Sequence, residues 1–411
     1  MRNGHQRCRI RKILLRKIGR KQTCVRSCGG TGELVSDLLS KMARILILTA
    51  SMGEGHNTAA RNIKAAIDKE SGGSAEVIVA DPYSRTNPVV NRLMQSGYTL
   101  AINRYPRAWK LVFDLLSKRG VVEGMGPMLA ELKGAVRSMW REFQPDLLVS
   151  TYPIYSFLVS KLRKREPGLP PLFTVITDST MINSAWYRWL CDGFLVADDA
   201  TANVLRDNRV PEELIHVTGF PVNVAFDELK PAPHPGKGPW KLILFPGGKS
   251  ERAETTLSRL EQIPNLEVTV VAGRRQSLHK KLQAAGLPAR GRLLAWTDEM
   301  PRLMSEHHFF VGKAGGATVQ EAIAAGLPFV VSHVVPGQEE GNIALIERAG
   351  IGALASSSAS RVGDVIEGAI SGDGAIWRAW RENTHRLGKP AASRAIAKLV
   401  LAKAASHSER G

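Results

Sequence analysis

The sequence predicts an α/β protein made of two doubly wound domains, each with a parallel sheet between layers of helices. Short apolar runs of strand length alternate with helical segments in both halves of the chain, which favours parallel sheets covered on both faces. Residues 229–239, rich in Pro and Gly, separate the halves and are expected to be a linker. At 411 residues the chain is long enough for two full cores.

The first domain is expected over residues 42–228. Strands are predicted at 43–49, 76–80, 146–150, 172–176 and 193–197. An Ala-rich helix is predicted at 57–69, and a long helical region is expected to end near residue 143.

The second domain is expected over residues 240–375. Strands are predicted at 242–245, 268–272, 293–295, 308–311 and 329–331, with a helix at 319–325. Helices at 376–411 are expected to follow it.

A basic tail precedes the first strand. Residues 1–41 hold eleven Lys and Arg against two acidic residues, so they carry +9 of the net charge of +18. We expect this tail to be disordered and able to bind anionic lipid or nucleic acid. A true start at Met42 is the alternative. The chain contains no apolar run long enough to cross a bilayer.

The most informative segment is 312–342, GKAGGATVQEAIAAGLPFVVSHVVPGQEEGN. It predicts a strand, a glycine turn, a helix whose first turn carries Glu321, a second strand and a polar loop. Gly315 and Gly316 would let the backbone approach a diphosphate, which would face the helix N–H groups. Glu321 suits a ribose diol. The alternative is that the glycines only make a tight turn. The same pocket is expected to use these polar residues: Lys313, Thr318, Gln338, Glu339 and Asn342.

A second glycine-rich turn, SMGEGH at 51–56, lies between the first strand and the first helix. Gly55 permits the tight turn and places His56 at the start of the helix. An imidazole there suits a general base that accepts a proton from a hydroxyl near neutral pH. The alternative is that His56 only caps the helix.

These two segments resemble the glycosyltransferases typified by monogalactosyldiacylglycerol synthase and the bacterial diacylglycerol glucosyltransferases. More distantly, they resemble the enzyme that adds N-acetylglucosamine to the peptidoglycan lipid precursor. The resemblance implies a GT-B fold, with a C-terminal helix that crosses back to the first domain. It implies inverting transfer of galactose or glucose from a UDP-hexose to diacylglycerol, with no metal and no cofactor. Ala314 replaces the Pro of the family's KPGG turn.

The resemblance also assigns roles outside those segments. Asp178 ends a strand and is a second catalytic candidate, and Trp186 is retained from the family's TD…H…W pattern. Asn183 replaces that pattern's histidine, so a mechanism with two histidines is in doubt. The remaining candidates for nucleotide contacts are Gly247, Gly248, Arg274, Thr297 and Met300, although Met300 could simply belong to the core.

Tyr105, Trp109 and Phe113 share one face of a predicted amphipathic helix. The resemblance places the lipid-facing part of the family here, so we expect contact with an anionic membrane surface. The protein is then expected at the cytoplasmic side of the cell membrane as a peripheral protein. The alternative is a helix packed on its own domain.

Three other functions remain open. N-acetylglucosaminyl transfer to a polyprenyl-linked or other lipid acceptor would use the same donor pocket, and a UDP-sugar epimerase would share the architecture. A nucleic-acid binder is disfavoured because the basic residues concentrate in a tail that could be removed. The four cysteines lack metal-ligand spacing and are expected to be reduced thiols. The donated hexose and the oligomeric state are not determined by the sequence.

Overall fold

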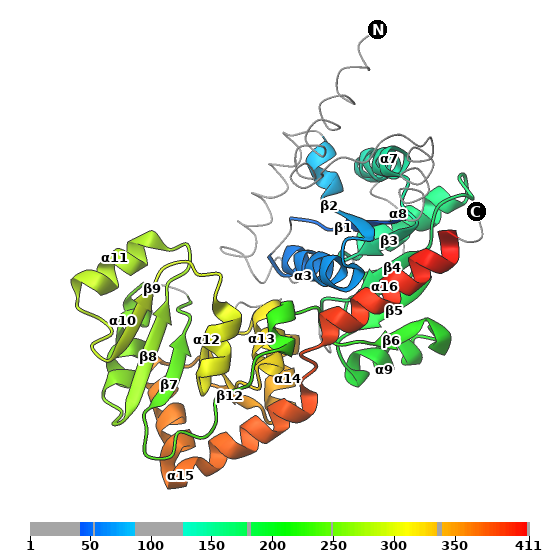
Figure 1. Cartoon of the computed structure of the whole chain (residues 1–411). Coiled ribbons are helices and arrows are strands. Elements are labelled where there is room, and N and C mark those ends of the chain that lie inside the picture. The colour runs from blue at the N-terminus through cyan, green and yellow to red at the C-terminus, as the bar shows by residue number, and fades with distance from the viewer. Residues whose placement is uncertain are drawn as a thin grey trace, which may run out of the picture. The chain divides into compact units, whose positions relative to one another are not determined.

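The computed structural model describes residues 42–51, 54–86, 126–178, 182–247, 250–334 and 339–408. These residues form two six-stranded sheets, and every strand pair that the structure describes is parallel. The predicted α/β class is therefore confirmed (Figure 1).

The first sheet has the strand order β2-β1-β3-β4-β5-β6. Because β1 lies between β2 and β3, the connections leaving β1 and β3 turn to opposite sides of the sheet. This is the topological switch point at which open α/β sheets bind ligands. The strands are β1 (Ala43–Leu48), β2 (Ala75–Ala80), β3 (Leu147–Ser150), β4 (Leu172–Val175), β5 (Gly193–Val196) and β6 (Ile215–Val217).

Alternating side chains of β1 enter two different cores. Ile45 and Ile47 pack with α3 on one face, whereas Leu46 and Leu48 pack with α7 and α8 on the other. Each such buried side chain contributes roughly 1.5–3 kcal/mol. The helices are α3 (Glu54–Ser71), α7 (Gly126–Phe143), α8 (Ile154–Arg163) and α9 (Asp199–Asp207), with 3-10 turns η1 (Pro82–Arg85), η2 (Ser184–Trp186), η3 (Glu212–Leu214) and η4 (Val224–Asp227).

The second sheet has the order β12-β11-β10-β7-β8-β9, so its switch point lies between β7 and β10. The strands are β7 (Trp240–Leu244), β8 (Leu266–Val271), β9 (Gly291–Leu294), β10 (Phe309–Lys313), β11 (Phe329–His333) and β12 (Gly352–Leu354). Its helices are α10 (Ser250–Glu261), α11 (Gln276–Ala284), α12 (Met300–Glu306), α13 (Gly316–Ala324), α14 (Glu340–Arg348) and α15 (Ala359–Leu387).

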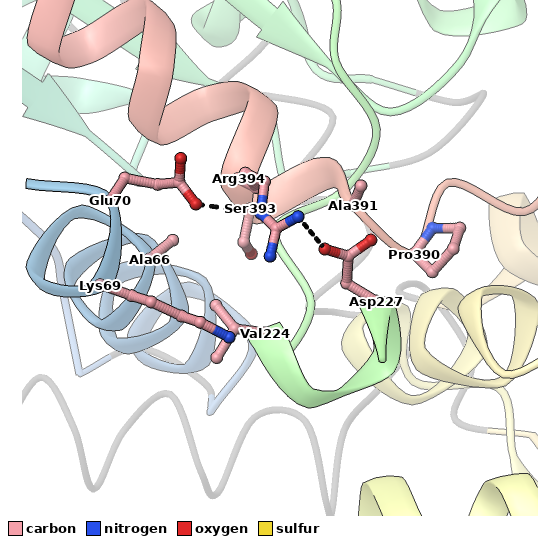
Figure 2. A pocket seen from close by; sticks show the side chains of 9 residues that line it. All are labelled: Ala66, Lys69, Glu70, Val224, Asp227, Pro390, Ala391, Ser393 and Arg394. Carbon is pink, nitrogen blue, oxygen red and sulfur yellow. Dashed lines mark ion pairs between the residues drawn. The ribbon is translucent and has the colours of Figure 1, made fainter. Parts of the chain in front are cut away.

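The last helix, α16 (Ala392–Ser408), packs on the first sheet and on α3, as the resemblance implied. Figure 1 shows α16 alongside the first sheet. Figure 2 shows how it is attached: Arg394 pairs with Glu70 of α3 at 2.9 Å and with Asp227 of η4 at 2.8 Å. Two carboxylates from separate elements thus fix one guanidinium, which holds the chain end against the first domain.

Several predicted elements differ in extent. The helix predicted at 319–325 begins at Gly316, because Gly315 already has extended cap geometry, so Glu321 lies in its second turn rather than its first. The helix expected from 376 is present as the second part of α15, which follows the non-helical residues 371–374, whereas the first part, which begins at Ala359, was not predicted. The short strands β6 and β12 were not predicted, since three residues give no clear periodicity. The domain limits stay a prediction.

Within the described residues, none of the helices is both long enough and apolar enough to span a bilayer.

Candidate functional site

The candidate residues lie in loops and helix starts that follow the carboxyl ends of parallel strands. In the first sheet they follow β1 and β4, and in the second they follow β7, β8, β9, β10 and β11. Carboxyl ends of neighbouring parallel strands share one edge of a sheet, so these loops lie close together although their sequence positions are far apart.

His56 is the third residue of α3 and is half-buried. Its Nδ1 shares a hydrogen bond of 2.9 Å with the hydroxyl of Thr177, which follows β4. The ring also meets Tyr152 edge-on, with centroids 5.1 Å apart, and lies 6.1 Å from Trp186. Loops after β3 and β4 therefore hold this imidazole.

Asp178 follows Thr177 and accepts a hydrogen bond of 2.6 Å from the indole N–H of Trp186, which is almost fully buried. Burial raises the pKa of Asp178, against the opposing effects of the His56 charge and of this indole N–H. The structure therefore brings both catalytic candidates, His56 and Asp178, and the retained Trp186 into one cluster.

Burial lowers the pKa of His56 below its usual range, although the Asp178 charge and the Thr151 carbonyl oppose that effect. The free imidazole is therefore neutral at pH 7, as a general base must be. Once the ring gains a proton, the nearby carboxylate stabilises the imidazolium.

A group of tyrosines anchors the loop that precedes His56. The Tyr155 hydroxyl donates to the Thr49 carbonyl at 2.8 Å, and Tyr83 hydrogen-bonds with Tyr152. Asp81 accepts hydrogen bonds from the backbone N–H groups of Ser51 and Tyr83. The chain that enters the glycine-rich turn is thus held at Thr49 and Ser51.

In the second domain, Gly315 and Gly316 begin α13 directly after β10. Gly315 has φ −67° and ψ 137°, which any residue can adopt. A Cβ added at Gly315 or Gly316 would meet no atom closer than 3.6 Å. The fold itself thus does not require glycine at either position, and a ligand that approaches the backbone closely would explain both.

Gly316 lies against the first domain. A Cβ built on it would stand 3.6 Å from the Thr177 carbonyl oxygen and 3.7 Å from Nδ2 of Asn342. Thr177 also holds His56. The start of α13 and the His56 imidazole therefore flank the same residue.

Lys313 and Glu339 form an ion pair of 3.7 Å beside this turn. Glu339 is buried, whereas Lys313 is half exposed, and the Lys313 ammonium lies 3.7 Å from the Cβ position of Gly315. Asn342 donates a hydrogen bond of 2.9 Å to the Ala314 carbonyl and so holds the turn. A cation thus stands at the N–H end of α13, which suits an anion.

Burial raises the pKa of Glu321 to about 7. Within the described part of the chain, its carboxyl makes no hydrogen bond or ion pair. Its position on α13, one turn beyond Thr318, is compatible with a ligand held at the helix start.

Gly247 follows β7 and faces His333, whose ring atoms would lie 3.2 Å from an added Cβ. A side chain at Gly247 would displace His333, so packing alone explains why a glycine occupies this position. Burial lowers the pKa of His333, and the charges of Arg252 and Lys313 lower it further. Both cations therefore lie near the His333 ring.

The Arg274 guanidinium lies over the Trp296 ring at 4.5 Å, and Trp296 is 58% exposed. The Thr297 hydroxyl accepts from the Glu299 backbone N–H at 3.1 Å. Met300 begins α12 and packs against the core of the second domain, in line with the alternative interpretation for that residue.

Gly55 has open space around its Cβ position. The Asn183 side chain accepts from the Ala185 backbone N–H at 2.9 Å and so caps η2. These predicted site residues lie outside the described residues: Gly248, Gln338, Tyr105, Trp109 and Phe113.

Sequence reasoning missed Thr177, Tyr152 and His333 as site residues. Each one lies at or just after the end of a strand, which was the available signal. Among the residues with assigned positions, no three His, Cys, Asp or Glu side chains gather in a way that could hold a metal ion. Metal independence stays a prediction.

A sequence model of the monogalactosyldiacylglycerol (MGDG) synthase family matches residues 56–222. A processive diacylglycerol beta-glucosyltransferase of Bacillus mycoides (strain KBAB4) is 26% identical over 330 residues, which cover 75% of this chain and 81% of the relative. The enzyme of the same name from Bacillus cytotoxicus is 26% identical over 326 residues, with the same coverage.

Solved structures share the fold at low sequence identity. MurG of Acinetobacter baumannii has a TM-score of 0.57 at 14% identity and covers 88% of this chain and 99% of its own. Phytolacca americana UGT2, complexed with UDP-2fluoro-glucose and pterostilbene, has a TM-score of 0.57 at 13% identity and covers 89% and 100%. The predicted GT-B fold is confirmed.

Proposed function

We propose, since the chain belongs to the monogalactosyldiacylglycerol synthase family, that it transfers a hexose from a UDP-sugar to the hydroxyl of diacylglycerol. The observation that carries this proposal is the position of Thr177, whose hydroxyl holds His56 while its carbonyl faces Gly316 at the start of α13. A base and an anion site on opposite sides of one residue suit the displacement of a diphosphate by an alcohol.

In the proposed reaction His56 accepts the proton of the acceptor hydroxyl. The acceptor oxygen forms a bond to the anomeric carbon, while the bond from that carbon to the diphosphate oxygen breaks. UDP departs on the side opposite to the attack, so the anomeric configuration inverts. Asp178 stabilises the imidazolium that forms, since its carboxylate interacts with the His56 charge.

The departing diphosphate gains negative charge as the bond breaks. The backbone N–H groups at the start of α13, together with Lys313, are the donors that stabilise it. Glu321 accepts hydrogen bonds from the ribose diol, and Gln338 and Glu339 contact the sugar. We propose that this arrangement replaces a metal ion.

The donated sugar is either glucose or galactose. The relatives are named as glucosyltransferases, which favours glucose. We expect a peripheral protein at the cytoplasmic side of the cell membrane, because the acceptor is a lipid.

The test is a product analysis with the purified chain, dioctanoylglycerol and a panel of UDP-sugars. The expected product is a monohexosyl diacylglycerol with inverted configuration, whose formation continues in excess EDTA. Absence of any glycolipid would reject the proposed activity. A parallel incubation without acceptor identifies an epimerase, since only that enzyme would convert the UDP-sugar into its epimer. Product that forms only from UDP-N-acetylglucosamine and a polyprenyl-linked acceptor would establish the alternative transferase.

A further inference from the structure

The His333 imidazole lies at the carboxyl edge of the second sheet, where it reaches past the neighbouring strand. His333 is the last residue of β11, and β10 separates β11 from β7. Its half-buried ring nevertheless contacts the turn after β7, because its Cδ2 atom would stand 3.2 Å from a Cβ added at Gly247. The ring thus extends past the carboxyl end of β10 and lies at the switch point between β7 and β10, where open α/β sheets bind ligands.

Two cations act on this ring, and both come from other elements. Arg252 of α10 donates a hydrogen bond of 3.0 Å to the carbonyl of Ser332, the residue before His333. Lys313, which also pairs with Glu339, is the register partner of His333 on β10. Burial lowers the pKa of His333, and these two charges lower it further, whereas no carboxylate of the described residues raises it. The ring is therefore neutral at pH 8 and lies in surroundings that favour an anion.

The ring nitrogens of His333 have no hydrogen-bond partner within the described part of the chain. The two buried histidines of the same domain differ, since His307 and His308 bond protein groups through both ring nitrogens. A neutral imidazole has one N–H donor and one acceptor nitrogen. In His333 both are available to a ligand at the switch point.

We propose that the His333 imidazole binds the diphosphate of the UDP-sugar, with one ring N–H donating a hydrogen bond to a phosphate oxygen. The inference rests on the proposed function and adds a donor contact to it. The diphosphate is expected at the start of α13, which follows Lys313, and His333 lies beside the same strand end. Lys313 and His333 would then contact it from two neighbouring strands. Gly247 serves this contact by leaving the space in which the ring lies.

The test compares UDP binding by wild type, His333→Phe and His333→Gln, measured by calorimetry at pH 8. Phenylalanine keeps a planar ring against Gly247 and removes both nitrogens, so UDP affinity should fall about tenfold. Glutamine has an amide N–H donor and should recover most of the affinity. The matched control, His216→Phe, replaces another half-buried histidine, which lies on β6 of the first domain, and should bind UDP as wild type does.

Melting temperatures and a second ligand separate a contact from a packing effect. The phenylalanine variant should keep the wild-type melting temperature and lose affinity equally for UDP and UDP-glucose, which share the diphosphate. Unchanged UDP affinity would overturn the inference, and so would a loss confined to UDP-glucose, because the ring would then contact the hexose. A loss that glutamine does not recover, or one accompanied by a lower melting temperature, would also overturn it, since His333 would then only support the fold.

Transfer to dioctanoylglycerol separates this inference from the proposed function. If wild type binds UDP but makes no glycolipid, the proposed function fails, while the comparison of the variants still decides whether His333 contacts the diphosphate. If wild type binds neither UDP nor UDP-glucose, both proposals fail.

Discussion

The Thr177 hydroxyl lies 2.9 Å from Nδ1 of His56, although the two residues are 121 positions apart in the chain. One belongs to the loop after β4 and the other to the start of α3. The carbonyl of Thr177 faces Gly316, so this single residue borders both the candidate base and the candidate anion site. Its two contacts can be tested separately.

Thr177→Val keeps the shape of the side chain and removes the hydroxyl that orients His56. We expect kcat to fall about 10- to 100-fold, because a misplaced base transfers protons poorly. UDP affinity should not change, since the Thr177 backbone remains in place. Thr177→Ser, which keeps a hydroxyl, should restore most of the rate. A valine variant with wild-type turnover would show that this hydrogen bond does not position the base.

Gly316→Ala separates folding from ligand binding. The added methyl group meets only ordinary contacts at 3.6 Å and 3.7 Å, so the melting temperature should stay the same or rise slightly. The same methyl group occupies the space where a diphosphate approaches the helix start, so UDP affinity should fall at least tenfold by calorimetry. Gly368→Ala in α15, which also meets no close atom, is the control and should bind UDP normally. Normal UDP binding by the Gly316 variant would place the diphosphate elsewhere.

Glu321 predicts a pH dependence of UDP affinity, because burial raises the pKa of its carboxyl to about 7. The ionised carboxylate is the form that accepts hydrogen bonds from a ribose diol. Affinity should therefore rise as the pH rises through 7, and it should be about tenfold weaker at pH 6 than at pH 8. Calorimetric titrations of wild type and Glu321→Gln distinguish this effect from titration of UDP itself. Parallel pH curves for the two proteins would remove Glu321 from the pocket.

Two buried histidines in the second domain predict acid sensitivity of the fold. His307 bonds the Leu303 carbonyl and the Thr269 hydroxyl, and His308 bonds the Pro233 carbonyl and the Lys241 N–H, so neutral rings satisfy every partner. Burial lowers the pKa of each histidine to about 4.

As the pH falls, the imidazoles of His307 and His308 gain a proton near pH 6.5 in the unfolded chain. In the folded protein they do so only at lower pH. The free energy of unfolding should thus be constant above pH 6.5 and fall toward pH 4, by about 2 kcal/mol per histidine at pH 5. Urea denaturation at pH 7.5 and pH 5 measures this loss. His308→Asn should be less stable at pH 7.5 but should lose about 2 kcal/mol less than wild type between the two pH values. An equal loss in both proteins would contradict the assignment.

The local parts of this site could be predicted from the sequence, because each lies within a short run of residues. The turn from Lys313 to Gly316 and the turn before His56 are read from glycine spacing next to an apolar strand. The strand order could not be predicted, since no local signal states that β1 pairs with β3 or β7 with β10. Thr177 was missed for the same reason: its partners come from α3 and α13.

Residues with two plausible roles show a second limit of predicting the site from the sequence. Met300 packs on the core, and Asn183 caps η2, and neither use is visible in the sequence because both depend on tertiary neighbours. Arg274 lies over Trp296, a contact between loops after two neighbouring strands. Their roles toward UDP and the acceptor stay predictions.

The most direct measurement compares UDP binding and hexose transfer in His56→Ala. The account predicts that the variant binds UDP with the wild-type dissociation constant and that kcat for transfer to dioctanoylglycerol falls about 100- to 10,000-fold. Transfer at the wild-type rate would contradict the account, because the reaction would then need no imidazole at the start of α3.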